Sequence, residues 1–199
     1  MNSYSLMTLF AIGSLCATAA IGQQNTVLPD YPNSYEIVRD VVEMPAGRQM
    51  GSGNAIDIDS RGNVWVFERC GGNNGACPES DVDPVLQFSP EGKLLSSFGS
   101  GLFVWPHGIV VDEDDNLWII DAGVIDGEKG NQIFKFTQDG ALLLELGEPG
   151  VRGDGPGQFN EPSDLAFGPD GTLYILDGHI NPDSNRRIVR MTAEGDFIE

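Results

Sequence analysis

Along most of this chain, short runs of alternating apolar and polar residues are separated by turns rich in glycine, aspartate and asparagine. Alternation over such short runs predicts β-strands that are buried on one face. Three segments carry the same pattern without gaps, namely residues 54–68, 107–121 and 163–177. Their first residues lie 53 positions (107 minus 54) and 56 positions (163 minus 107) apart, so the pattern is an internal repeat.

The second half of each repeat holds two further apolar runs around a tight turn that ends in glycine. Glycine accepts the positive φ that such turns require. Each repeat is therefore expected to form four antiparallel strands, which make one blade of a β-propeller. The predicted fold is all-β, with blades at about residues 50–100, 103–148 and 159–199.

The β-branched residues 35–42 predict one more strand, which precedes the first repeat and has no inner partners of its own. We expect it to be the outer strand of a closing blade. Propellers usually need four or more blades to close, and this sequence holds about three. We therefore expect residues 34–199 to be a partial propeller, half of a six-bladed ring, that pairs with further blades of the same protein.

The first residues have the features of a secretory signal. Residues 6–21 are apolar, rich in small side chains and fewer than a membrane span requires. Residues 1–22 are predicted to be a signal peptide, and the polar, proline-containing residues 23–33 a linker. An uncleaved membrane anchor is the alternative. A cleaved signal leaves no membrane span in the mature chain and predicts a secreted or periplasmic protein.

Export and charge limit the chemistry that we expect. An exported protein meets an oxidising compartment, so Cys70 and Cys77, which flank a loop rich in glycine and asparagine, are predicted to form a disulfide. Two cysteines alone cannot complete a tetrahedral zinc site. The formal net charge of -19 repels a phosphate backbone and excludes nucleic acid as a partner.

Three polar residues, Asn54, His107 and Ser163, stand at the start of the expected inner strands, where they can point toward a propeller axis. Histidines that converge there from several blades would form a metal site with an open position. His107 is one of only two histidines in the chain. It is therefore either one corner of such a site or a packed histidine that is hydrogen-bonded to a backbone carbonyl.

Arg69 follows the second strand of the first repeat, and the equivalent positions of the other two repeats hold Ala122 and Gly178. The arginine is therefore not part of the blade architecture. Its guanidinium suits a substrate carboxylate, because it donates two parallel hydrogen bonds. The alternative is a salt bridge with Glu68 or a neighbouring aspartate.

An acidic residue recurs at the end of the second strand in every repeat, as Glu68, Asp121 and Asp177. We interpret these residues as acceptors of backbone N–H groups, or as partners of a loop arginine such as Arg186, rather than as paired catalytic acids. Aromatic residues that recur in register are expected to pack blade against blade: Trp65, Trp118 and Tyr174.

Over about residues 50–199, the repeats resemble NHL-type repeats. Several runs also resemble the peptidyl-α-hydroxyglycine α-amidating lyases. These runs are Trp-Pro-His-Gly-Ile-Val-Val-Asp at 105–112, Asn-Leu-Trp-Ile-Ile-Asp at 116–121, residues 144–147 and 156–166, and Leu-Asp-Gly-His at 176–179 with Asn-Arg at 185–186. The resemblance implies a six-bladed propeller that cleaves a peptidyl-α-hydroxyglycine into a peptide amide and glyoxylate.

The resemblance also implies the cofactors and the residues of the site. Members of this family bind zinc through three histidines near the axis, with a structural calcium below them. His107 falls on the first zinc ligand, and Ile56 and Ile109 fall where backbone carbonyls bind calcium. Arg69 falls on the active-site arginine. His179 stands where the animal lyases have a tyrosine that takes part in the chemistry, so it is predicted to be catalytic or to assist the metal.

The sequence therefore predicts a secreted, metal-dependent lyase that acts on a peptide-like small substrate. The alternative is a non-catalytic NHL-repeat propeller that binds a protein, a peptide or a glycan, because propellers host many functions. A calcium propeller of the lactonase type is a third option. It would place Asn, Asp and Glu ligands around the axis, which Asn54 fits and His107 does not.

Overall fold

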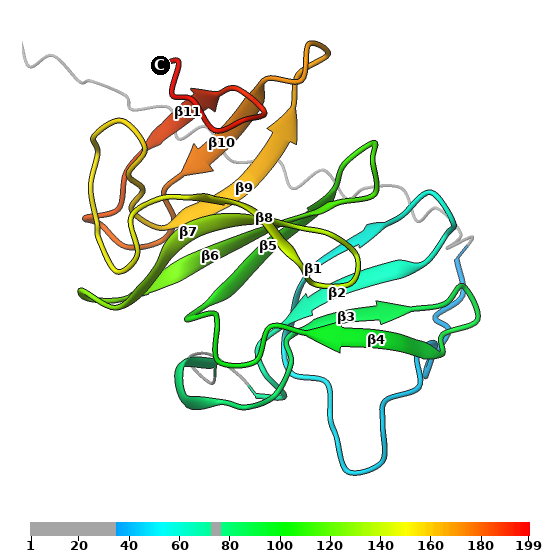
Figure 1. Ribbon diagram of the computed structural model, residues 1–199. Coiled ribbons are helices and arrows are strands. Elements are labelled where there is room, and N and C mark those ends of the chain that lie inside the picture. The colour runs from blue at the N-terminus through cyan, green and yellow to red at the C-terminus, as the bar shows by residue number, and fades with distance from the viewer. Residues whose placement is uncertain (1–34, 73–76) are drawn as a thin grey trace, which may run out of the picture. The chain divides into compact units, whose positions relative to one another are not determined.

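The structure is a computed structural model that describes residues 35–72 and 77–199 (Figure 1). The signal peptide predicted over residues 1–22 and the linker predicted over residues 23–33 lie outside the described residues. Eleven strands and one 3-10 turn, Cys77–Glu79, make up the regular structure of the described part, which contains no α-helix. Within that part, no helix has the length and apolar character of a membrane span.

Three antiparallel sheets follow one another along the chain, and neighbouring strands in each sheet are consecutive in sequence (Figure 1). The first sheet consists of β1 (Gly53–Ile58), β2 (Val64–Glu68), β3 (Val85–Phe88) and β4 (Leu94–Phe98). The second consists of β5 (Pro106–Val111), β6 (Leu117–Ile125), β7 (Lys129–Phe136) and β8 (Leu142–Leu146). The third consists of β9 (Pro162–Phe167), β10 (Leu173–Asp177) and β11 (Arg187–Met191). Each sheet corresponds to one sequence repeat, which confirms the all-β, propeller-type fold.

The third sheet has three strands instead of the four that its repeat predicts. After the turn that ends at Gly195, only Phe197 forms a bridge, with Met191 of β11. The backbone N–H of Ile198 also donates to the Arg190 carbonyl over 2.9 Å. The short run after the turn therefore reaches two residues of β11, which is too few for a ladder.

The strand predicted over residues 35–42 is not formed. Asp40 has a φ of 57°, in the left-handed region, and this interrupts the extended backbone that a strand needs. Val42 packs against the first sheet through its side chain, but in this segment backbone pairing with that sheet starts at Glu43, whose N–H donates to the Gly92 carbonyl over 2.8 Å. The β-branched pattern of this segment was therefore a misleading signal, because a strand also needs a partner along its whole length.

The first strands of the sheets lie side by side, because β1 contacts β5 and β5 contacts β9. Between the first two sheets, Trp65 and Phe67 of β2 pack with residues of β5, β6 and β7, and between the second and third sheets Trp118 packs with β9, β10 and β11. Both tryptophans are fully buried, which confirms that they pack sheet against sheet, whereas Tyr174 at the equivalent position of the third repeat is exposed and does not. Apolar side chains between sheets thus fix how the inner strands meet.

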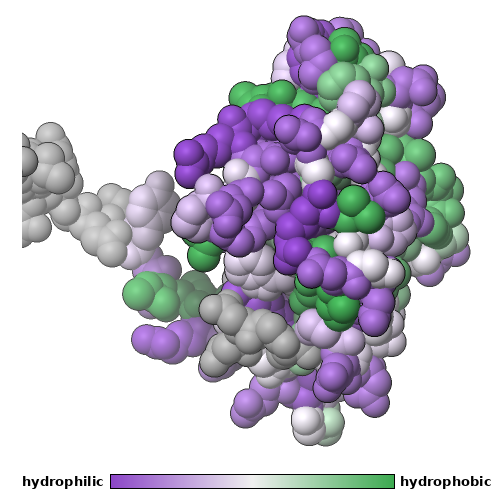
Figure 2. Space-filling model, turned by 90° about the vertical axis from the view of Figure 1, so that its left-hand side faces the viewer, coloured by the Kyte–Doolittle hydropathy of each residue, from purple (hydrophilic) through white to green (hydrophobic). Residues whose placement is uncertain are grey.

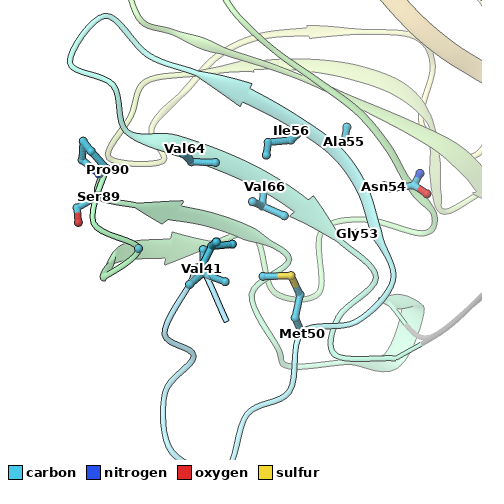
Figure 3. Close-up of a pocket in the computed structure, with 12 residues that line it drawn as sticks. Val41, Met50, Gly53, Asn54, Ala55, Ile56, Val64, Val66, Ser89 and Pro90 are labelled. Atoms are coloured by element: carbon cyan, nitrogen blue, oxygen red, sulfur yellow. The ribbon is translucent and has the colours of Figure 1, made fainter. Parts of the chain in front are cut away.

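The outward faces of the first and third sheets also carry apolar side chains. On the first sheet, Val64 and Val66 face Met50 and Val41 across a cavity of about 500 Å³ (Figure 3). On the third sheet, Leu176 of β10 is exposed. On the face drawn in Figure 2, hydrophilic residues predominate and hydrophobic ones form separate patches. The two outer sheets therefore expose side chains of the kind that the inner interfaces bury.

Candidate metal and substrate site

The recurring acids anchor the loops that lead into the inner strands. The buried Asp121 accepts hydrogen bonds from the backbone N–H groups of Val104, over 2.8 Å, and Trp105, over 2.6 Å. Burial raises the pKa of Asp121 to about 6, against these hydrogen bonds, which lower it. The carboxylate thus fixes the loop that enters β5, as the interpretation of these acids as structural acceptors predicts.

The other two recurring acids, Glu68 and Asp177, also accept hydrogen bonds from backbone N–H groups, and each of them also pairs with an arginine. Glu68 accepts from the Gly51 N–H over 2.6 Å and from Nη2 of Arg48 over 2.9 Å. Asp177 accepts from the Asn160 N–H over 2.8 Å and from Nε of Arg187 over 2.9 Å. The partner of Asp177 is therefore the arginine that begins β11, and not the preceding Arg186, which sequence reasoning had named.

His107 lies at the start of β5 and reaches across to the third sheet. Its Nδ1 is 2.8 Å from the backbone carbonyl oxygen of Ser163. A carbonyl only accepts, so Nδ1 carries the proton and Nε2 keeps its lone pair. Burial lowers the pKa of His107, and the positive charge of Arg69 nearby adds to this effect, so the imidazole is held neutral.

His179 lies in the loop that follows β10, next to His107. The two ring centroids are 4.5 Å apart and the ring planes are nearly perpendicular, at 78°. Trp105 touches both rings edge-on, with centroid distances of 6.0 Å to His107 and 5.1 Å to His179. Two histidines that are far apart in the sequence thus meet against one tryptophan.

Arg69 joins the same group from the first sheet. Its guanidinium carbon lies 5.0 Å from the centroid of the Trp105 ring, which is cation–π geometry. Its Nη2 donates to Oδ1 of Asn54 over 3.0 Å. We call Arg69, Trp105, His107 and His179 the His107 cluster. Three of these residues were predicted from the sequence as separate candidates, and the structure brings them together.

The remaining predicted site residues surround the cluster. Ile56 on β1 and Ile109 on β5 line a hollow of about 440 Å³ together with His107 and His179. The Ile56 side chain is exposed and that of Ile109 is buried. Directly after Arg69, the predicted disulfide between Cys70 and Cys77 is present. It closes the loop that begins next to the arginine.

The donors of the His107 cluster suit a metal ion as a partial ligand set. In the described part of the chain, no group of three His, Cys, Asp or Glu side chains is arranged so that it could hold a metal ion. The neutral imidazole of His107 presents Nε2 while its Nδ1–H is fixed by a carbonyl, which is the usual arrangement of a metal-binding histidine. His107 therefore fits zinc as one ligand, and a complete zinc site needs further ligands in addition to it.

Sequence reasoning missed two members of this arrangement. Trp105 was noted only as part of a motif, although an aromatic residue just before an inner strand stands where loops of neighbouring blades meet. The carbonyl of Ser163 carries no signal in the sequence, because every residue has one.

No family model matches the chain. The chain is 25% identical over 164 residues to a probable peptidyl-alpha-hydroxyglycine alpha-amidating lyase of Caenorhabditis elegans, and the match covers 76% of this chain and 44% of the relative. It is 29% identical over 167 residues to peptidyl-alpha-hydroxyglycine alpha-amidating lyase 1 of Drosophila melanogaster (75% and 29%). It is 31% identical over 150 residues to NHL repeat-containing protein 3 of Mus musculus (72% and 39%). The chain thus spans less than half the length of each of these relatives.

Among solved structures, a streptogramin B lyase matches with a TM-score of 0.50 and 17% sequence identity, covering 75% of this chain and 40% of that chain. At this identity the likeness concerns the fold alone. It agrees with the propeller-type arrangement of the three sheets.

Proposed function

Because this chain is an NHL-type relative of the peptidyl-α-hydroxyglycine α-amidating lyases, we propose that it serves as a metal-dependent lyase. The substrate is an N-acyl-α-hydroxyglycine, and the products are an amide and glyoxylate. The observation that carries the proposal is the His107 cluster, in which a cation suited to a carboxylate and two imidazoles contact one tryptophan.

In this proposal, Arg69 binds the carboxylate of the hydroxyglycine. The N–H donors of its guanidinium match the two oxygens of the substrate carboxylate. One hydrogen bond to Asn54 restrains the Arg69 side chain. The bond between the α-carbon and the amide nitrogen breaks, while the hydroxyl proton leaves and the nitrogen gains a proton. His179 lies beside His107 and acts at the same reacting centre.

Zinc and calcium are the expected ions. His107 is the zinc ligand, through Nε2. When bound, zinc supplies Lewis-acid polarisation of the substrate hydroxyl and lowers its pKa. The backbone carbonyls of Ile56 and Ile109, on neighbouring inner strands, are the proposed ligands of a structural calcium.

We propose that the protein is secreted or periplasmic. The disulfide between Cys70 and Cys77 supports an oxidising compartment. The apolar start of the sequence supports export. Further blades of the same protein are the proposed partners of the apolar outer sheet faces.

The test is glyoxylate release from α-hydroxyhippurate by purified protein, measured beside its zinc content. We expect release that stops on treatment with a chelator and returns with zinc. Protein that binds zinc and releases no glyoxylate would exclude the lyase and favour the second candidate, a non-catalytic propeller that binds a protein, peptide or glycan. The 31% identity to NHL repeat-containing protein 3 of Mus musculus, a relative named for its repeats, is the observation that keeps this second candidate.

A further inference from the structure

We propose that His179 is a second metal ligand beside His107, so that this chain binds one transition-metal ion through two imidazoles from neighbouring sheets. The inference rests on the proposed function, because it starts from the ion that His107 is expected to bind. It assigns His179 a role on the metal instead of a role as acid or base.

The first support is the distance between the rings. His107 and His179 are the only histidines in the sequence, yet their ring centroids lie 4.5 Å apart. Nitrogen ligands sit about 2.0–2.1 Å from zinc, so two imidazoles on one ion must approach to within a few ångströms of each other. The two rings lie as close together as this requirement demands.

The second support is the state of each imidazole. The Nδ1–H of His107 donates a hydrogen bond to the Ser163 carbonyl, which leaves the lone pair of Nε2 free to bind a metal ion. In His179, Nδ1 is buried and makes no hydrogen bond. A buried polar atom without a partner costs free energy, and a bound cation would satisfy it.

The third support is the way in which the two histidines are tied together. Ser163 bonds His107 through its carbonyl, while its Oγ donates to the carbonyl of Gly178 over 2.9 Å. The N–H of His179 donates to Oγ of Ser184 over 3.1 Å. One serine therefore fixes the spacing between the loop of His179 and the ring of His107, which is how a preformed ligand pair is built.

The choice of ion follows from the donors. Imidazole nitrogens suit zinc, copper and nickel, and suit calcium and magnesium poorly. Zinc is the expected ion, and Cu(II) is a spectroscopic probe of the same donors.

The test compares wild-type protein with His179→Phe, which removes both nitrogens and keeps an aromatic ring against Trp105. With Cu(II) bound, pulsed EPR counts the coordinated imidazoles, and we expect one more in the wild type than in His179→Phe. Titration calorimetry with zinc chloride should show binding weaker by about tenfold or more in the variant. Ile180→Ser, an exposed substitution in the same loop, is the matched control and should bind zinc like the wild type.

The outcomes separate this inference from the proposed function. An equal imidazole count and equal zinc affinity in wild type and His179→Phe would overturn the second ligand and leave the lyase proposal standing. Wild-type protein that binds neither ion would overturn both. Zinc binding that depends on His179 in a protein without glyoxylate release would support the ligand and exclude the lyase.

Discussion

Oδ1 of Asn54 accepts a hydrogen bond from Nη2 of Arg69 over 3.0 Å, while Nδ2 of the same asparagine donates to the Pro106 carbonyl over 2.6 Å. One side-chain amide thus links the arginine after β2 to the start of β5, where His107 lies. Arg69 is consequently held in a fixed position relative to the imidazole, although the two residues belong to different sheets.

This link predicts the effect of changing Arg69. Arg69→Met should lower kcat/KM for α-hydroxyhippurate by about 10- to 100-fold, since a charge-assisted hydrogen bond to a carboxylate contributes about 1.5–3 kcal/mol. The methyl ester of the substrate, which lacks the anionic carboxylate, should lose far less. Arg152→Met, at an exposed arginine, is the control and should leave both rates unchanged. An equal loss with acid and ester would mean that Arg69 does not bind the carboxylate.

The disulfide next to Arg69 predicts sensitivity to reduction. Cys70 and Cys77 close a short loop, and a cross-link of this size contributes about 2–3 kcal/mol through the entropy of the unfolded chain. We expect dithiothreitol, or the double change Cys70→Ser with Cys77→Ser, to lower the melting temperature. Thermal unfolding followed by circular dichroism measures this, and an unchanged melting temperature would show that the cross-link adds nothing to stability.

Gly123 packs directly against Trp105 of the His107 cluster. A Cβ there would lie 2.5 Å from Cβ of Trp105 and 2.9 Å from its backbone nitrogen, and neither atom can move freely. Gly123→Ala should therefore displace Trp105, lower the free energy of unfolding by about 1–3 kcal/mol and weaken zinc binding. Denaturant unfolding and zinc titration measure the two effects.

The matched control for that change is Gly53→Ala on β1, where a Cβ meets nothing within 4 Å. It should bind zinc like the wild type and lose little stability. If Gly123→Ala keeps full zinc affinity, Trp105 does not position the two histidines.

How much of this could be foreseen depends on the kind of contact. The repeat register predicted the three sheets, because each strand pairs with its sequence neighbour and alternation marks the buried face. It also placed the structural acids such as Asp121 at strand ends. Residues 35–42 show the limit, because Asp40 adopts a left-handed conformation that no apolar pattern reveals.

The site itself was only partly predictable. His107, His179 and Arg69 were identified singly, from motif and chemistry. Their approach to one another depends on how three loops pack around Trp105, and on the Ser163 carbonyl, which is a backbone group with no identity of its own. Contacts between sheets are set by packing over the whole interface, so the spacing of residues in the sequence does not determine them.

Asp121 predicts how stability depends on pH. Its pKa is raised to about 6 in the folded protein from the usual value of 3.8, chiefly by burial, so the folded state binds more protons between these values. The free energy of unfolding should therefore fall as pH rises from about 4 to 6, by about 3 kcal/mol in total for this group. Asp59 and Asp112 act in the opposite direction, because their pKa values are lowered and the stability that they add is lost as pH falls below about 4. The most stable range should thus lie near pH 4–5.

The variant Asp121→Asn isolates this contribution, because an amide does not titrate. In the wild type, both carboxylate oxygens of Asp121 accept hydrogen bonds from backbone N–H groups. In the variant, the NH₂ group of the amide replaces one of these oxygens and cannot accept, so the variant should be less stable than the wild type at pH 5. As pH rises to 7, the buried Asp121 of the wild type becomes charged, and this lowers the free energy of unfolding. The variant has no titrating group at this position, so its free energy of unfolding does not fall for this reason. The difference in unfolding free energy between the two proteins should therefore shrink by about 3 kcal/mol between pH 4 and pH 7, measured by urea denaturation at each pH. Parallel curves would mean that water reaches the carboxylate and that burial does not raise its pKa.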